Sequence, residues 1–375
     1  MSAMIYFDNA ATTMIKPECV IKSSSYALEN LCANSGRGSH SAAVKAASIV
    51  YNARKAVQNL VGGDDVIFGL NCTDALNTVI FGTARRGHVV TTVYEHNSVL
   101  RPLYELSRRG LIRFTAVAPD AHGVIDPAEI ERAIRPDTYM IIVNNASNVT
   151  GAVAPITQIG GIAKKHGLLY LVDGAQTVGY VDIDMKQSNI DYLCFSPHKG
   201  LHGVQGVGCL CMRAGAPLSP FKFGGTGTAS NTMAQPDDVP EGFECGTLPV
   251  HSIYSLITAI NYYEKMPLGQ KRNLAECGNA LRSGLSEIKG VKLYGKYSLL
   301  PNVVCFNLDS MPAAAVGDIL NEQYDVAVRC GLHCAPLCHK YLGTTETGAV
   351  RASLSYHNTM SEVEFFLKAI NEIAK

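Results

Sequence analysis

An acidic residue and a basic residue follow two strand-like segments of the chain and could together hold a cofactor. Asp173 follows the apolar run LLYLV, and Lys199 follows the run YLCF after Ser196, Pro197 and His198. Ligands bind at the carboxyl ends of the strands in open α/β sheets, so both side chains are expected at one edge. Lys199 could bond to pyridoxal phosphate while Asp173 keeps the ring nitrogen protonated, which makes the ring an electron sink. A salt bridge between the two residues is the alternative, and spacing does not decide between them.

Two further segments could supply groups for the same cofactor. Cys72, Thr73 and Asp74 lie between a predicted strand and a predicted helix. Backbone N–H groups at this helix start, together with the Thr73 hydroxyl, could hold a phosphate, although an ordinary helix cap has the same pattern. His96 follows the next strand, where its ring could lie flat on the cofactor. A lone histidine in such a place is more often a surface residue or a buried one with its own partners.

Thiols and imidazoles are concentrated in one short segment near the C-terminus. Beside Arg329 it contains Cys330, His333, Cys334, Cys338 and His339. Structural zinc sites usually have closely spaced cysteine pairs separated by a longer spacer, whereas these cysteines recur at four-residue intervals, so we expect no metal site. A cysteine in this loop beside Arg329 and His333 could instead have its thiolate stabilised, as a nucleophile requires; the alternative is that all three thiols are structural. Cys330 and Cys338 are expected to be structural.

The elements that must position these side chains alternate between strand and helix. β-Branched segments recur at 65–70, 88–93, 112–117, 139–144, 168–172, 192–195 and 206–212, with helical spacing between most of them. This alternation predicts crossover connections and a largely parallel sheet. The continuously apolar runs YMIIV and LLYLV are typical of strands that are covered on both faces. The sequence therefore predicts an α/β fold.

A glycine- and proline-rich segment, 223–246, interrupts this pattern and predicts a long ordered loop. The glycines at 224–228 match neither a phosphate-binding P-loop nor the strand-to-helix turn of dinucleotide-binding proteins. A helix-rich tail follows the loop. We expect a large domain over 15–255 and a smaller α+β domain over 256–375 that includes the N-terminal segment 1–14.

Composition and charge exclude several classes of protein. The chain has 375 residues, 47% of them hydrophobic and 17% charged, and 32 Lys and Arg balance 32 Asp and Glu. Such a balance is typical of a compact globular protein, and a basic nucleic-acid-binding surface is therefore not the first expectation. No apolar run is long enough for a membrane span, and the first residues lack the pattern of a signal peptide. We therefore expect a cytoplasmic protein whose twelve cysteines are mostly reduced.

Taken together, these segments resemble the class V aminotransferases of fold-type I, and within them the cysteine desulfurases and selenocysteine lyases. The matching pieces run nearly end to end: 6–13 (YFDNAATT), 36–40 (GRGSH), Thr73 with Asn77, 95–96 (EH), 147–151 (SNVTG), 173–176 (DGAQ), 195–199 (FSPHK), 246–247 (GT), 329–335 (RCGLHCA) and 351–355 (RASLS). Each piece is weakly diagnostic, but their shared order is specific. The resemblance implies a mostly parallel seven-stranded sheet in the large domain and a homodimer with shared active sites.

The resemblance also implies how pyridoxal phosphate is held. Lys199 would bond to the cofactor, Asp173 would pair with its ring nitrogen, and Gln176 would donate to its phenolic oxygen. His96 would stack on the ring. The phosphate would be bound by Thr73, Ser196, His198 and, from the other subunit of the dimer, Thr247.

A reaction follows from the same resemblance. Asn148, Arg329 and Arg351 would hold the substrate, with Arg351 clamping its carboxylate through paired hydrogen bonds. L-Cysteine would displace Lys199, the freed amine would move the α-proton, and the ring would take up the resulting charge. The Cys334 thiolate would then attack the substrate sulfur, leaving a persulfide on Cys334 and releasing L-alanine. A sulfur-acceptor protein is a possible further partner.

Three residues depart from the pattern of this family, and several alternatives stay open. Cys72 stands where threonine is common, Pro197 where glycine is common, and Asn97 where a second histidine often follows. A selenocysteine lyase that releases selenide from L-selenocysteine is the first alternative, and another class V aminotransferase or lyase acting on a small amino acid is the second. A non-catalytic sulfur carrier or metal-binding protein that uses the cysteines of 330–338 is the third.

Overall fold

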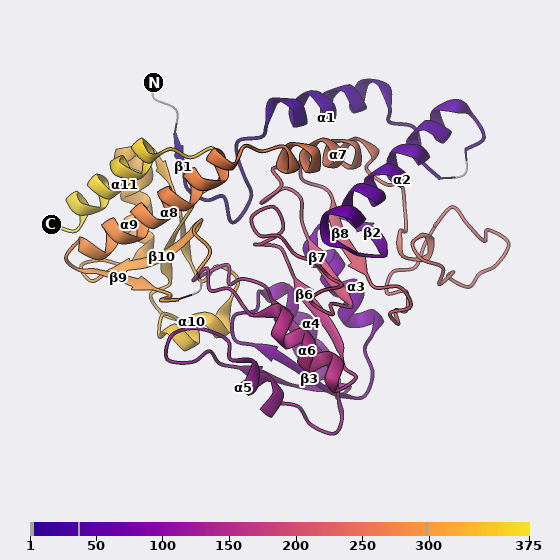
Figure 1. The fold of residues 1–375 in the computed structure, drawn as a ribbon, viewed down its shortest axis with the longest axis horizontal. Coiled ribbons are helices and arrows are strands. Elements are labelled where there is room, and N and C mark those ends of the chain that lie inside the picture. Colours follow the sequence, from indigo (N-terminus) through magenta and orange to yellow (C-terminus); the bar gives the residue numbers. More distant parts are fainter. Residues whose placement is uncertain (1–3, 37, 298) are drawn as a thin grey trace.

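A computed structural model describes residues 4–36, 38–297 and 299–375, and these residues form three β-sheets with their covering helices (Figure 1). One sheet has seven strands, a second sheet, near the C-terminus, has four, and a third has two. Arg37, which belongs to the predicted motif at 36–40, lies outside the described residues, as do residues 1–3 of the N-terminal segment.

The seven-stranded sheet contains every segment that the sequence predicts as a strand of the large domain. Its strands are β2 (Asp65–Gly69), β3 (Gly87–Thr92), β4 (Ile112–Val117), β5 (Thr138–Asn144), β6 (Leu169–Asp173), β7 (Tyr192–Phe195) and β8 (Gly208–Met212). Their order is β2-β8-β7-β6-β5-β3-β4. The pairs from β4 through β7 are parallel, and β8 runs antiparallel to both β7 and β2. The prediction of an α/β fold with a mostly parallel seven-stranded sheet is confirmed.

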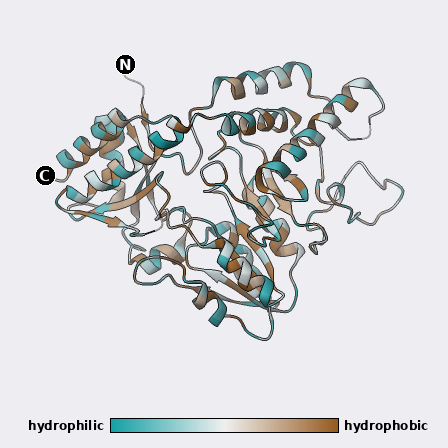
Figure 2. Ribbon diagram, viewed as in Figure 1, coloured by the Kyte–Doolittle hydropathy of each residue, from teal (hydrophilic) through white to brown (hydrophobic). Residues whose placement is uncertain are grey.

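Both faces of this sheet are buried, which explains why its strands are continuously apolar. In β5, Met140 and Ile142 belong to one hydrophobic cluster, whereas Ile141 and Val143 belong to the cluster on the opposite face. The first face is covered by α3 (Cys72–Gly82) and α4 (Asn97–Arg108). The second face is covered by α2 (Ser41–Val61), α6 (Ile156–Lys165) and α7 (Val250–Glu264). Figure 2 shows the hydrophobic colour concentrated in the central strands.

The remaining helices of this part lie around the same core. The helix α1 (Glu18–Asn30) packs along α7, and the short helix α5 (Pro127–Arg132) lies beside α6 (Figure 1). The predicted loop lies between β8 and α7 and contains only the 3-10 turn Glu241–Phe243. It is anchored at Glu244, which accepts hydrogen bonds from Arg54 Nη1 at 2.7 Å and from the Phe68 N–H at 2.6 Å.

The C-terminal part forms an antiparallel sheet in the order β12-β13-β10-β9; the helices at 268–287 and 313–324 pack on its strands, and the helix at 360–373 packs on these two helices. Its elements are α8 (Leu268–Glu287), β9 (Val291–Tyr294), β10 (Val303–Leu308), α9 (Ala313–Tyr324), β11 (Val326–Ala327), β12 (Arg329–Gly331), α10 (Pro336–Leu342), β13 (Ala349–Ser353) and α11 (Met360–Ile373). The N-terminal strand β1 (Ile5–Tyr6) pairs in parallel with β11, so this N-terminal segment lies against the C-terminal part. The exact domain limits at 14, 255 and 256 stay a prediction.

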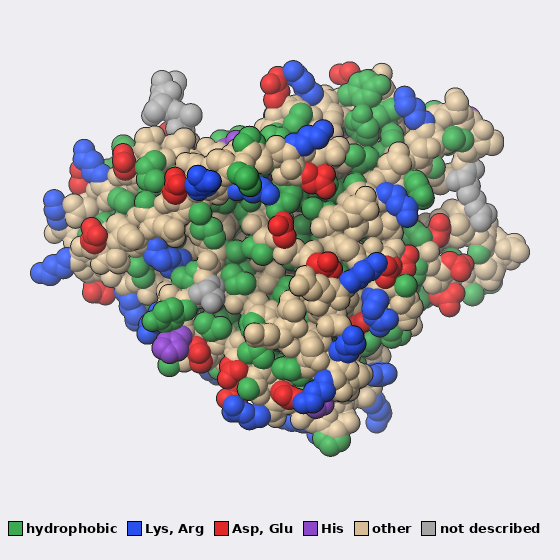
Figure 3. All heavy atoms as spheres, in the orientation of Figure 1, with side chains coloured by type: hydrophobic (Ala, Val, Ile, Leu, Met, Phe, Trp, Pro, Cys, Tyr) green, Lys and Arg blue, Asp and Glu red, His purple; other side chains and the backbone are tan. Residues whose placement is uncertain are grey.

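Charged side chains are distributed over the surface without separation by sign. Lys and Arg alternate with Asp and Glu over the face shown in Figure 3. Within the described ranges, no helix combines the length and the apolar character that a membrane crossing requires.

Candidate active site

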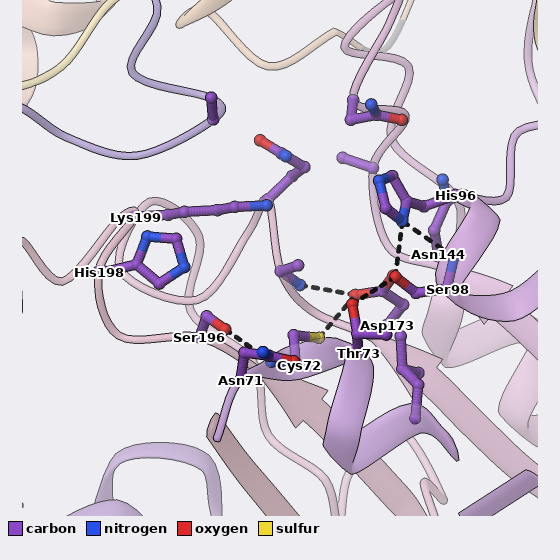
Figure 4. A pocket seen from close by; sticks show the side chains of 16 residues that line it. Asn71, Cys72, Thr73, His96, Ser98, Asn144, Asp173, Ser196, His198 and Lys199 are labelled. Carbon is purple, nitrogen blue, oxygen red and sulfur yellow. Dashed lines mark hydrogen bonds between the residues drawn. The ribbon is translucent and has the colours of Figure 1, made fainter. Parts of the chain in front are cut away.

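A cavity of about 220 Å³ opens at the carboxyl ends of β5, β6 and β7. This is the edge where ligands bind in open α/β sheets. The cavity brings together residues from well-separated segments, among them the sequence-predicted Thr73, His96, Asn148, Asp173, Gln176, Ser196, His198 and Lys199. Figure 4 shows Lys199 extending from one side of the cavity toward the side that carries His96, with Asp173 and Thr73 near the helix start below.

Asp173 is the last residue of β6 and is held rigidly at the floor of the cavity. Strand register places it beside Asn144 of β5 and Cys194 of β7. Its Oδ1 accepts a hydrogen bond from the Ala175 N–H at 2.9 Å and a weaker one from the Cys72 thiol at 3.5 Å. A buried carboxylate that is oriented in this way can pair with a protonated ring nitrogen.

Lys199 carries an amine that burial makes easier to deprotonate. Desolvation lowers the pKa of Lys199, and the positive charges of Arg351 and Arg329 act in the same direction, whereas Cys72 and Asp173 oppose it. A neutral amine is the form that attacks an aldehyde or accepts a proton from carbon. Its environment therefore favours covalent and proton-transfer chemistry over a simple salt bridge.

The start of α3 provides donors for an anion. Asn71 caps the helix by accepting from the Asp74 N–H at 3.0 Å, and the Cys72 N–H donates to Ser196 Oγ at 2.7 Å. Thr73 Oγ1 lies 2.7 Å from Ser98 Oγ. Free N–H groups and the helix dipole make a helix start favourable for phosphate, and here hydroxyl groups surround it.

His96 presents a neutral ring to the cavity. It is the N-cap of α4, where Nδ1 accepts from the Ser98 N–H at 3.0 Å and lies 2.8 Å from Ser98 Oγ. Burial lowers the pKa of His96, and Asp173 only partly opposes this effect. A fixed, uncharged aromatic ring is suited to stacking on another ring.

The N-terminal segment closes one side of the cavity. Ala11 lines it, and Gln176 Nε2 donates to the Ala10 carbonyl at 3.0 Å. His198 Nδ1 lies 3.0 Å from Thr12 Oγ1, and burial beside two lysines lowers the pKa of His198 to about 4. The stretch at 6–13 thus contributes part of the cavity wall, which sequence reasoning did not assign to it.

Arg329 and Arg351 lie next to the cavity and share Asp8. They face each other on β12 and β13, and Arg351 is 2% exposed. Arg351 Nη2 donates to Asp8 Oδ1 at 2.9 Å, Arg351 Nη1 donates to the Asn148 carbonyl at 2.9 Å, and Arg329 Nη2 donates to Asp8 Oδ2 at 2.8 Å. Arg351 Nε is buried without a partner among the described residues, so a donor is left for a carboxylate. Apart from its place in the stretch 6–13, nothing in the sequence around Asp8 indicates this role.

Cys334 does not line the cavity but lies exposed in the adjoining loop. Its carbonyl accepts from the Asn97 N–H at 2.7 Å, and the His333 carbonyl accepts from Asn148 Nδ2 at 2.7 Å. In contrast, burial raises the pKa of Cys338 to about 12 and that of Cys330 to about 11, so both remain thiols. Among the residues that the structure describes, no three His, Cys, Asp or Glu side chains are grouped so as to hold a metal ion.

Thr247 lies apart from this cavity. It lines a separate surface hollow together with Gly36, Arg54, Gly225 and Gly227. Three polar residues that line the cavity were missed by sequence reasoning: Asn71, Ser98 and Asn144. The available signal was their position directly after a predicted strand, at a helix start or at the last residue of a predicted strand.

The groups around the cavity match the parts of pyridoxal phosphate. The start of α3 with Ser196 and His198 can take an anion, Asp173 can pair with a ring nitrogen, and Lys199 can bond to an aldehyde. Asn148 Oδ1 is buried without a partner among the described residues, which leaves an acceptor for a bound molecule. The donor set therefore fits this cofactor.

Comparisons with known proteins agree with this chemistry. The family model described as aminotransferase class-V matches residues 5–366. A probable cysteine desulfurase of Methanothermobacter thermautotrophicus is 32% identical, over 99% of this chain and 94% of that protein, and one of Pyrococcus abyssi is 31% identical over the same shares. The apo structure of cysteine desulfurase from Thermococcus onnurineus NA1 superposes with a TM-score of 0.90 at 30% identity, covering 99% of this chain and 94% of that one.

Proposed function

The chain belongs to the class V aminotransferase family, and from that premise we propose that it is a pyridoxal-phosphate-dependent cysteine desulfurase. It converts L-cysteine to L-alanine and takes the sulfur onto Cys334. The observation that carries the proposal is the convergence of Lys199, Asp173 and the phosphate donors of α3 in one cavity whose neighbouring loop presents an exposed cysteine.

The cofactor, when bound, supplies an electron sink that stabilises negative charge at the substrate Cα. Lys199 would hold it covalently, Asp173 would face its ring nitrogen, and His96 would cover its ring. Thr73, Ser196 and His198 would hold its phosphate. Each of these groups reaches the cavity from a strand end or helix start, so their relative positions are set by the rigid sheet.

Lys199 Nζ is the proposed proton carrier. Because its pKa is lowered, a larger fraction of the amine is neutral and can accept the α-proton of the substrate and later return one. Arg351 would bind the substrate carboxylate through its free donors, with Asp8 and the Asn148 carbonyl fixing the plane of the guanidinium.

Cys334 is the proposed sulfur nucleophile. Its thiolate forms an S–S bond to the substrate sulfur while the Cβ–S bond breaks, and the electron pair of that bond remains on the carbon. A proton then completes L-alanine, so the reaction needs no external oxidant. The persulfide is left on an exposed side chain, where an acceptor protein or a small thiol can remove it.

A homodimer would complete the site. Thr247 lies outside the cavity of its own chain, in line with a donation to the phosphate of the partner subunit. Mixing Lys199→Ala with Thr247→Ala protein at limiting cofactor would then restore one intact site per mixed dimer. Activity above that of both parents is the expected outcome, and purely additive activity would contradict shared sites.

The function is tested by release of alanine and of sulfide or selenide from L-cysteine and L-selenocysteine in parallel, with reductant. Wild type is expected to act on L-cysteine, and Cys334→Ala to lose that turnover while retaining the visible absorbance of the bound cofactor. Cys19→Ala, which alters another exposed cysteine on α1, is the matched control. Turnover of selenocysteine alone, unchanged in Cys334→Ala, would identify a selenocysteine lyase instead.

A further inference from the structure

The backbone on either side of the Cys334 side chain is fixed by two groups from the cavity region. The Cys334 carbonyl accepts a hydrogen bond of 2.7 Å from the Asn97 N–H, and the His333 carbonyl accepts one of 2.7 Å from Asn148 Nδ2. We call these two hydrogen bonds the cysteine latch. Each joins the loop at 329–335 to a segment far away in the sequence.

The latch holds a strained stretch of backbone. His333 has φ 49° and Cys334 has φ 54°, so two consecutive residues with side chains adopt the left-handed conformation. Such a conformation is unfavourable for residues other than glycine and persists where surrounding contacts over-determine it. Since Cys334 itself is exposed, few packing contacts of its side chain are available for this purpose. The two hydrogen bonds are the contacts that hold its carbonyl and the preceding one.

Both hydrogen-bond donors belong to segments that also contribute residues to the cavity. Asn97 is the first residue of α4 and directly follows His96, the ring that faces the cavity. Asn148 lines the cavity, and its own carbonyl accepts from Arg351 Nη1 at 2.9 Å. The latch therefore connects the cysteine loop with the ring that would cover the cofactor and with the arginine that would bind the substrate carboxylate.

We propose that Asn97, through its backbone N–H, and Asn148, through its side-chain amide, are positioning residues that hold Cys334 at the rim of the cavity for attack on the substrate sulfur. The inference rests on the proposed function, which it deepens. The side chain of Asn97 has no part in the latch. Any residue with a backbone N–H could therefore replace Asn97 without loss of this hydrogen bond. A small displacement of the thiol would slow sulfur transfer far more than it would weaken substrate binding.

A proline at position 97 tests this hydrogen bond by itself. Asn97 occupies the first position of α4, where proline is favoured because its missing N–H has no partner within the helix. His96 has φ −71° and ψ 157°, a conformation that the residue before proline readily adopts. Asn97→Pro thus removes the donor to Cys334 with little change elsewhere, and Asn97→Ala, which keeps the N–H, is the matched control.

For Asn97→Pro we expect kcat for L-cysteine to fall by about 10- to 100-fold while KM changes by less than about twofold. The visible spectrum of the bound cofactor should stay unchanged, and Cys334 should be alkylated faster by iodoacetamide, as measured by peptide mass mapping. Asn97→Ala should match wild type in all four readouts. Equal kcat and equal alkylation rates in Asn97→Pro and Asn97→Ala would overturn the proposal.

A second variant covers the case in which Asn97→Pro is unstable. Asn148→Asp keeps the shape of the side chain but replaces the donor to the His333 carbonyl with an oxygen that repels it. Faster alkylation of Cys334 in the apo form of this variant is expected, and an unchanged rate would refute the role of Asn148. Because alkylation does not depend on turnover, altered alkylation in a protein that leaves L-cysteine untouched would uphold the latch and reject the proposed function.

Discussion

Replacement of Glu95 by glutamine should remove a pH dependence of stability that the wild-type chain carries. Glu95 is 0% exposed and lies directly before His96. Its Oε1 accepts from Thr92 Oγ1 at 2.7 Å and from the Asn144 N–H at 3.0 Å, whereas Oε2 is buried without a partner among the described residues. Burial raises the pKa of Glu95 from 4.5 to about 8, with the Thr92 and Asn144 hydrogen bonds opposing and Asp173 adding to the rise.

The sign and the size of the effect follow from proton binding. Between pH 4.5 and about 8 the folded chain retains this proton while the unfolded chain has lost it. The contribution of Glu95 to the free energy of unfolding is therefore fully present below pH 4.5. It falls as pH rises, by about 1.4 kcal/mol per pH unit and by about 5 kcal/mol over the whole window. Above the folded pKa, both states are ionised and this contribution becomes constant. A neutral Glu95 also avoids placing a second negative charge near Asp173.

The assay is guanidinium unfolding of the apo protein from pH 5 to pH 9. Other titrating groups are shared by the two proteins, so the difference in unfolding free energy between wild type and Glu95→Gln isolates this carboxyl. Relative to wild type, the variant should become steadily more stable as pH rises to about 8. Glu264→Gln, which changes an exposed glutamate on α7, should keep the wild-type profile. A difference that stays constant between pH 5 and pH 8 would refute the assignment of a protonated Glu95.

Three further predictions follow from individual contacts. Arg351→Lys should raise KM for L-cysteine by about 10- to 100-fold in steady-state assays. A lysine cannot form hydrogen bonds to Asp8, to the Asn148 carbonyl and to a substrate carboxylate at the same time. An unchanged KM would contradict the binding of the substrate carboxylate by Arg351. Glu244→Gln should reduce the unfolding free energy by about 3–5 kcal/mol, since it leaves the largely buried side chain of Arg54 without a counter-charge. The exposed neighbour change Glu241→Gln should have little effect in the same thermal or denaturant scan. Gly208→Ala should weaken cofactor binding by about 1–3 kcal/mol in a fluorescence titration, because the added Cβ would overlap the backbone of Asn71 at the start of α3. Gly161→Ala, where a Cβ meets open space, is the control. Equal affinities of the two variants for the cofactor would contradict the close contact between Gly208 and Asn71.

Most of the large sheet could be predicted from the sequence because its signals are local. The runs YMIIV and LLYLV became β5 and β6, which are covered on both faces, and the glycine-rich segment 223–246 became a loop. Asp173 and Lys199 could be found for the same reason, since each follows an apolar strand and strand ends of a parallel sheet share one edge. The fold is the α/β architecture of fold-type I pyridoxal-phosphate enzymes.

The contacts that refine the site could not be predicted in this way. The pairing of Asp8 with Arg329 and Arg351, the latch on Cys334, and the Arg54–Glu244 pair each join residues separated by long stretches of chain. Several of these residues stand out in the sequence, but which residue pairs with which depends on segments that meet only in the folded chain. The roles of Thr247 and of the residues around the cavity stay predictions until they are measured.

The amino-acid sequence by itself determined the class of fold, the sheet edge at which the cavity lies and the chemical types of the groups gathered there. These features could be recognised because the spacing of hydrophobic residues and the residues at strand ends are local signals over a few neighbouring positions. Only the tertiary structure decided which of these groups are neutral, which carbonyl each amide holds, and how the cysteine loop is fastened to the cavity. Those properties depend on burial and on distances between segments far apart in the chain, and burial and proximity exist only once the chain has packed.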